Sequence, residues 1–117
     1  MNIEKKHKYF DVSIGDWIKK IPNDLEFDAI SLKDIANVGR FDFELPNADS
    51  EEFVRLGVLE LIKAGASPVV RGSEAEFWVK CNHLGNNAEE IASNIVKNWK
   101  KSGVDPDEEG LWFAQVD

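Results

Sequence analysis

The sequence has one cysteine, two histidines and no long hydrophobic run, and each scarcity excludes a class of protein. Cys81 alone cannot form an internal disulfide, so a hydrophobic core must hold the fold. No apolar stretch approaches the roughly 18 residues that a membrane span needs. The first nine residues also lack the apolar centre of a secretory signal. These absences predict a soluble, cytoplasmic protein with no membrane partner.

Motifs that bind phosphate, zinc or an acyl group are missing as well. Cys81 and His83 are the one pair that could supply a nucleophile with its base, or half of a metal site. A cysteine that alternates in phase with Phe77 and Val79 is instead typical of a small core residue. The sequence therefore predicts no catalytic residue, no metal and no cofactor.

Residues 49–80 are predicted to form the centre of the fold, a long apolar helix followed by a β-hairpin. Asp49 and Glu52 have capping-box spacing, so we expect this helix to begin near Ser50. Its apolar residues cover more than half of the cylinder, which predicts burial from two sides. Gly65 and Pro68 then end the helix, and the hairpin strands are expected at 69–71 and 76–81.

Three more capping patterns begin at Ser13, Ser31 and Asn87, and each predicts a helix. The helix after Asn87 should end at Gly103. Residues 1–8 are basic and are expected to be a loose arm or the lead-in to a first strand or helix. The remaining expectations are a strand at 40–45 with Phe41, Phe43 and Leu45 inward, and a final strand at 111–116.

Together these elements predict one small α+β domain, residues 1–117, with helices packed on a short antiparallel sheet. The order of two helices, a long helix and a hairpin is partly winged-helix-like, and winged helices commonly bind DNA. The charge of the long helix disfavours that function, because Glu51, Glu52 and Glu60 outnumber its basic residues.

The net charge of −8 is concentrated in residues 21–60, which hold ten acidic and three basic side chains. Such a surface repels nucleic acid and anionic membranes and attracts a basic protein partner. The alternative is that the acidity only provides solubility.

Acidic clusters and one tryptophan are the candidate partner-binding residues. Four carboxylates lie within five residues near the end of the chain, and Trp78 is expected either to be covered by a helix or to be an exposed anchor. The complete candidate set is Asp105, Asp107, Glu108, Glu109, Trp78, Asp42, Glu44, Asp24, Glu26 and Asp28.

The C-terminal half contains a recognisable spacing. A helix carrying Ile91, Ile95 and Trp99 is followed by Gly103, Asp105-Pro106, Gly110 and Leu111-Trp112-Phe113. This pattern resembles the small acidic immunity proteins of bacterial contact-dependent growth inhibition and related polymorphic toxin systems, over about 65 residues from Asp49 to Phe113.

The resemblance implies a non-catalytic inhibitor that binds a basic toxin domain, expected to be a nuclease, in the cytoplasm of the producing cell. It transfers no contact residue to this chain, because such families do not share fixed toxin-contacting positions. A winged-helix regulator or adaptor and an enzyme of unrecognised type remain the alternatives.

Overall fold

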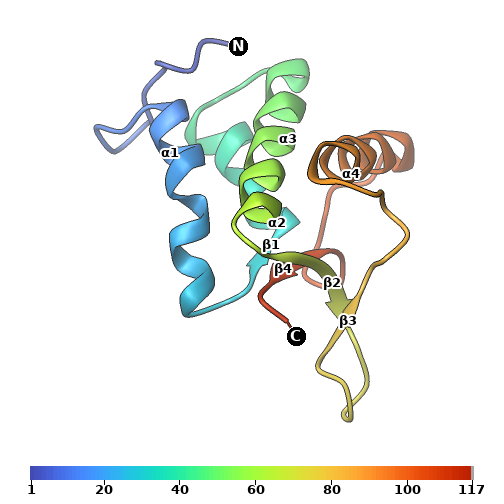
Figure 1. The fold of residues 1–117 in the computed structure, drawn as a ribbon. Helices are drawn as coiled ribbons and strands as arrows, with labels where there is room; N and C mark the ends of the chain where they lie inside the picture. The colour runs from blue at the N-terminus through green and yellow to red at the C-terminus, as the bar shows by residue number, and fades with distance from the viewer. Residues whose placement is uncertain (117) are drawn as a thin grey trace.

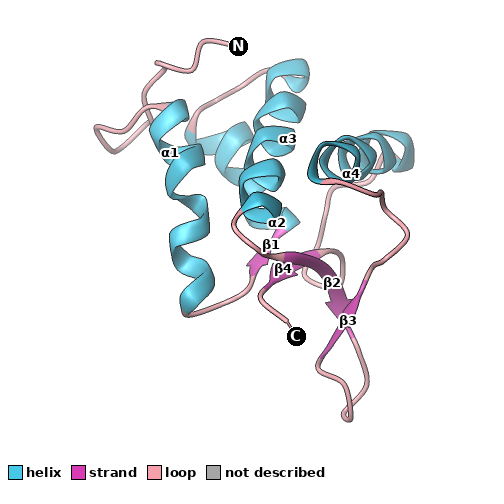
Figure 2. Ribbon diagram, viewed as in Figure 1, coloured by secondary structure: helices cyan, strands magenta, loops and turns pink. Residues whose placement is uncertain are grey.

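The apolar middle of the chain forms helix α3, and every other helix is arranged around it (Figure 1). The computed structural model describes residues 1–116. Helices lie above a small antiparallel sheet, as Figure 2 shows, and this confirms the predicted α+β class. The elements in chain order are α1 Ile14–Lys20, the 3₁₀ helix η1 Ile21–Glu26, β1 Ile30–Ser31, α2 Leu32–Asn37, the π-helix η2 Val38–Asp42, α3 Asn47–Lys63, β2 Ser67–Arg71, β3 Trp78–Lys80, α4 Ala88–Ser102 and β4 Trp112–Ala114.

Helix α3 is buried from two sides, as its wide apolar arc predicts. Phe53, Val54, Val58 and Leu61 have no exposed surface. Helices α1 and α2 pack on one side of α3 and α4 packs on the other. At Gly57 an added Cβ would lie 3.1 Å from the Ile21 side chain, so the helices approach closely there.

The predicted caps are correct for three helices and wrong for α3. Ser13, Ser31 and Asn87 each accept a hydrogen bond from the backbone N–H three residues later, at 3.2, 3.0 and 2.9 Å. Helix α3 instead begins at Asn47, after Pro46, and no side chain caps it. The fixed φ of Pro46, −66°, prepares the first turn, and the Ser50 N–H donates to the Pro46 carbonyl at 2.8 Å.

The four strands of residues 1–116 pair in the order β1-β4-β2-β3, with every pairing antiparallel. The predicted hairpin is confirmed as β2 and β3. The predicted final strand is confirmed as the shorter β4, which lies inside the sheet between β1 and β2. Phe113 of β4 is completely buried against the helices, so this late strand closes the core.

The strand predicted at residues 40–45 is wrong. The chain continues from α2 into η2, and the N–H of Phe43 donates to the Val38 carbonyl at 3.0 Å. Phe43 and Leu45 are buried as predicted, but Phe41 is exposed. A widened helical turn therefore places Phe43 and Leu45 in the core, whereas alternation alone had assigned them, with Phe41, to the inner face of a strand.

The winged-helix order is present, but the surface such a protein would present to DNA is covered. Helix α4 packs across α3, and Arg55 of α3 hydrogen-bonds Glu52 and lies 3.6 Å from Glu89 of α4. Lys100 of α4 also lies 3.4 Å from Glu51. Helix α3 is therefore a core element, not a free recognition helix.

Leu61→Ala should lower the free energy of unfolding by about 2–5 kcal/mol, because it removes buried methyl groups and leaves a cavity. Denaturant titration measures the loss, with Lys63→Ala on the exposed side of the same helix as control. A loss below about 0.5 kcal/mol, which is typical of surface positions, would contradict the burial of α3.

Candidate functional site

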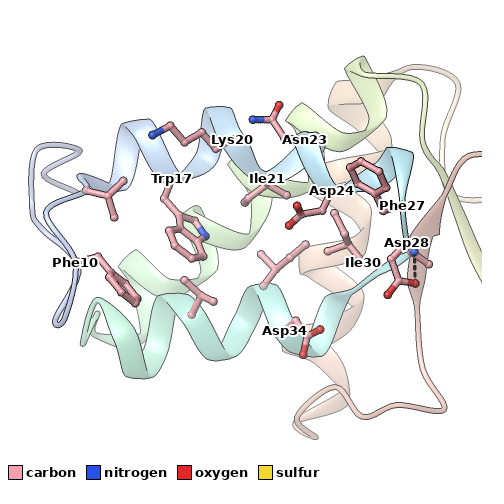
Figure 3. A pocket seen from close by; sticks show the side chains of 14 residues that line it. Phe10, Trp17, Lys20, Ile21, Asn23, Asp24, Phe27, Asp28, Ile30 and Asp34 are labelled. Carbon is pink, nitrogen blue, oxygen red and sulfur yellow. Dashed lines mark hydrogen bonds between the residues drawn. The ribbon is translucent and has the colours of Figure 1, made fainter.

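A groove of about 730 Å³ lies between α1 with η1 on one side and α2 on the other (Figure 3). Its volume falls within the range of roughly 300–1,000 Å³ typical of binding sites. The floor is formed by apolar side chains that stand beside the core, namely Trp17, Ile21, Ile30, Ile35 and Val38. In Figure 3, Trp17 and Ile21 point from α1 and η1 into the space above α2.

Three carboxylates and one lysine form the rim of the groove. Asp24, Asp28 and Asp34 line it together with Lys20, and all four side chains are exposed. The Asp28 carboxylate accepts the Ala29 N–H at 2.8 Å, which fixes its position. The rim therefore carries a net negative charge around an apolar floor.

Two exposed phenylalanines stand at opposite ends of the groove (Figure 3). Phe27 follows η1 and has 83% of its surface exposed, and Phe10 of the N-terminal arm has 62% exposed. Exposed aromatic rings beside charges are typical of protein-binding surfaces. The groove thus offers two aromatic contacts to a partner.

The N-terminal arm, predicted to be a loose arm or the lead-in to a first strand or helix, leads into α1 and is anchored by His7. The backbone N–H of His7 donates to the Val12 carbonyl at 2.8 Å, and the backbone N–H of Ile14 donates to the Lys5 carbonyl at 2.9 Å. The His7 side chain is buried, and its ring stacks 5.4 Å from that of Trp17. A sequence reading without contacts could not reveal this, because the arm has no periodicity.

The tautomer of His7 follows from its partners. Nδ1 accepts the N–H groups of Tyr9 at 3.0 Å and of Phe10 at 3.3 Å, so it cannot carry a proton in this arrangement. The proton of the neutral ring is then on Nε2, which donates to the Asp42 carboxylate at 3.2 Å. His7 therefore holds Phe10 at the end of the groove and supports Trp17 in its floor.

The structure separates the candidate residues of the first acidic segment. Asp24 and Asp28 line the groove, whereas Glu26 is exposed on η1 outside its lining. The Asp42 carboxylate is hydrogen-bonded to the His7 ring. Glu44 is exposed, and its backbone has a left-handed conformation with φ 53°.

The second acidic segment is tied back to the body of the protein. Asp105 pairs with Arg40 at 2.9 Å, and Glu108 lies 3.6 Å from Lys33. Asp107 accepts the Glu109 N–H at 3.0 Å, which shapes the turn. Within residues 1–116, Glu109 is the member of this loop that forms neither a side-chain ion pair nor a side-chain hydrogen bond.

Trp78 lies on the sheet face opposite the buried Phe113. Its ring packs 5.6 Å from Trp112, and Arg71 lies over the Trp112 ring at 5.4 Å. Trp78 is half-buried, so another strand residue rather than a helix covers it, and it is only partly available as an anchor.

Cys81 is half-buried and His83 is exposed, and no hydrogen bond joins the two side chains in the described part of the chain. Phe77 and Val79, the residues in phase with Cys81, are exposed, so the expected core strand face is wrong. The β2–β3 hairpin extends beyond the helices that would cover it (Figure 1). Burial raises the pKa of the Cys81 thiol, which lowers its thiolate fraction at neutral pH.

Among residues 1–116, no group of three or more His, Cys, Asp or Glu side chains is placed to hold a metal ion. No helix in the same range has the length and apolarity of a membrane span. No protein-family model, no curated protein and no solved structure matches this chain.

Asp34, Phe10, Trp17 and Phe27 belong to the groove but were not among the sequence candidates. The spacing of Trp17 is that of a core residue of a helix, and the spacing of Asp34 is that of a helix-capping pattern. Structural roles therefore already explained both residues, and neither indicated a binding site. Phe27 gave the usable signal, since it is a large aromatic residue placed directly between two acids, Glu26 and Asp28.

His7→Ala should lower the free energy of unfolding by about 1–3 kcal/mol, because the Tyr9 and Phe10 N–H groups and Asp42 lose their partner. Hydrogen exchange should speed up in residues 8–12. His83→Ala, at the exposed second histidine, is the matched control. Equal stability of the two variants would show that the ring does not anchor the arm.

Proposed function

We propose that this protein is a non-catalytic immunity protein that binds and neutralises a basic toxin domain, with a nuclease as the expected toxin, in the cytoplasm. The observation that carries the proposal is the α1–α2 groove, which combines an apolar floor, three rim aspartates and two exposed phenylalanines. The spacing of helix, Asp-Pro loop and Trp-Phe strand in the C-terminal half, which resembles that of immunity proteins, agrees with it.

The chemistry of the groove suits a protein segment with basic and apolar side chains. Apolar groups would bury against Trp17 and Ile21, and Lys or Arg side chains would meet Asp24, Asp28 and Asp34. A cleft that binds nucleic acid is basic by necessity. An acidic inhibitor can occupy such a cleft directly, without any reaction of its own.

The groove is a better candidate contact than the Asp105–Glu109 loop. Two carboxylates of that loop already face Arg40 and Lys33, so a partner would have to displace those ion pairs. The rim aspartates of the groove pair with no basic side chain in residues 1–116. Their charge is therefore available to a partner.

The winged-helix alternative has a direct test. Because α3 lies beneath α4 and the surface is acidic, we expect no binding of duplex DNA tighter than about micromolar at physiological salt, the range of ordinary non-specific binding. A gel-shift titration measures this. Tighter binding would favour a DNA-binding regulator over an inhibitor.

The proposed function is tested with the protein domain encoded immediately upstream, the place where the toxin of an immunity protein is expected. Replacing Asp24, Asp28 and Asp34 together by Asn keeps the local acceptors and removes the charge. Association should slow and lose most of its salt dependence, since rim charges act chiefly on the association rate.

Phe27→Ala should speed dissociation of the complex with the upstream domain by roughly tenfold or more, as for an aromatic hot spot. The matched control replaces Asp107 by Asn and Glu109 by Gln in the C-terminal loop. If the loop variant alone changed the rates, the partner would bind the loop and not the groove. If the upstream domain did not bind at all, the immunity function would be contradicted.

A further inference from the structure

Within residues 1–116, the outer edge of β3 is a second surface without a partner. In the order β1-β4-β2-β3 this strand is terminal, and in the described part of the chain it pairs only with β2 (Figure 2). Native proteins usually protect such edges, because their unpaired N–H and C=O groups can recruit another strand. Here the edge is carried on a hairpin that extends away from the helices (Figure 1).

The hydrogen bonds of the hairpin define which backbone groups face outward. The Gly72 N–H donates to the Phe77 carbonyl at 3.0 Å, and the Cys81 N–H donates to the Pro68 carbonyl at 2.9 Å. Bonded and non-bonded positions alternate along an antiparallel pair, so Val79 also faces β2. The N–H and C=O groups of Trp78 and Lys80 therefore point away from the sheet.

Apolar side chains are exposed to water at this edge. Phe77 has 68% of its surface exposed and Val79 has 38%. The Phe77 ring contacts that of Trp78 with a centroid distance of 4.9 Å. Glu76 and Lys80, of opposite charge, flank the three apolar residues symmetrically about Trp78.

We propose that two copies of this chain pair through β3, antiparallel, about a two-fold axis at Trp78. In this register the two Trp78 residues are opposite each other, Phe77 is opposite Val79 of the second copy, and Glu76 is beside Lys80 of the second copy. Every apolar residue meets an apolar residue, and each charge meets its opposite. Cross-strand pairs of these kinds stabilise sheets.

The alternation of the backbone excludes every second register. Only positions with outward N–H and C=O groups can form the bonded pairs, so the register can shift only in steps of two residues. The next registers set Lys80 or Glu76 opposite Trp78 and lose the pairing of Glu76 with Lys80. The registers after these set Lys80 opposite Lys80 or Glu76 opposite Glu76, like-charge pairs that destabilise a sheet.

The pairing leaves the α1–α2 groove accessible. Ile30 of β1 lines the groove, and β1 is the opposite edge strand of the sheet. Self-association at β3 is therefore independent of partner binding in the groove, and either can fail without the other. The contact is small, so the dimer is expected to be weak.

Sedimentation across about 10 µM to 1 mM covers the range in which a small interface associates. The protein should shift from monomer toward dimer over this range. Glu76→Lys places two lysines together across the interface, and Lys80→Glu places two glutamates together. Each variant should weaken the dimer roughly tenfold, since the change acts at both symmetry-related pairs.

The decisive sample mixes Glu76→Lys protein with Lys80→Glu protein, because in the mixed dimer both charge pairs are again opposite in sign. Association should return in the mixture and in the double variant that carries both changes. This recovery also shows that the single variants are folded. A native protein that stays monomeric, or a mixture that associates no better than its components, would overturn the proposal.

Discussion

The burial of α3 from two sides is the constraint on which the rest of the structure depends. Phe53, Val54, Val58 and Leu61 lose all contact with water only if α1 and α2 lie on one side and α4 on the other. This arrangement commits α4 to covering α3. It also leaves the outer surfaces of α1 and α2, where the groove lies, without any further layer among residues 1–116.

His7 connects the core to the groove. Its ring touches Trp17 and Phe43, and Phe43 in turn packs 5.6 Å from Phe53 of α3. The same ring accepts the Phe10 N–H at the end of the groove. A single buried polar side chain thus sets the shape of one end of the groove, so the groove is already formed in the protein alone. A preformed surface avoids part of the ordering entropy that binding otherwise costs.

The elements that the sequence predicted correctly are those with a local physical cause. The caps at Ser13, Ser31 and Asn87, the left-handed Gly103 and the hairpin all depend on residues within a few positions of one another. Apart from the start of α3, which the local Pro46 sets in place of the predicted Asp49 cap, the errors arose where distant contacts decide. Gly39 lies so close to the Phe53 ring that an added Cβ would be 2.7 Å away, and this contact favours the π-helix over the strand expected at 40–45.

The groove was also missed because distant contacts form it. It joins the N-terminal arm, α1 and α2 only in three dimensions. Asp24 and Asp28 were found by charge alone.

The central claim is that the α1–α2 groove is the surface that binds a basic protein. Hydrogen exchange of this protein, alone and with the protein domain encoded immediately upstream, tests it most directly. The account predicts that protection on binding is concentrated in the arm around Phe10, in α1 and η1, and in residues 27–38. Protection confined to the Asp105–Glu109 loop or to the β2–β3 hairpin, with the groove unchanged, would contradict it.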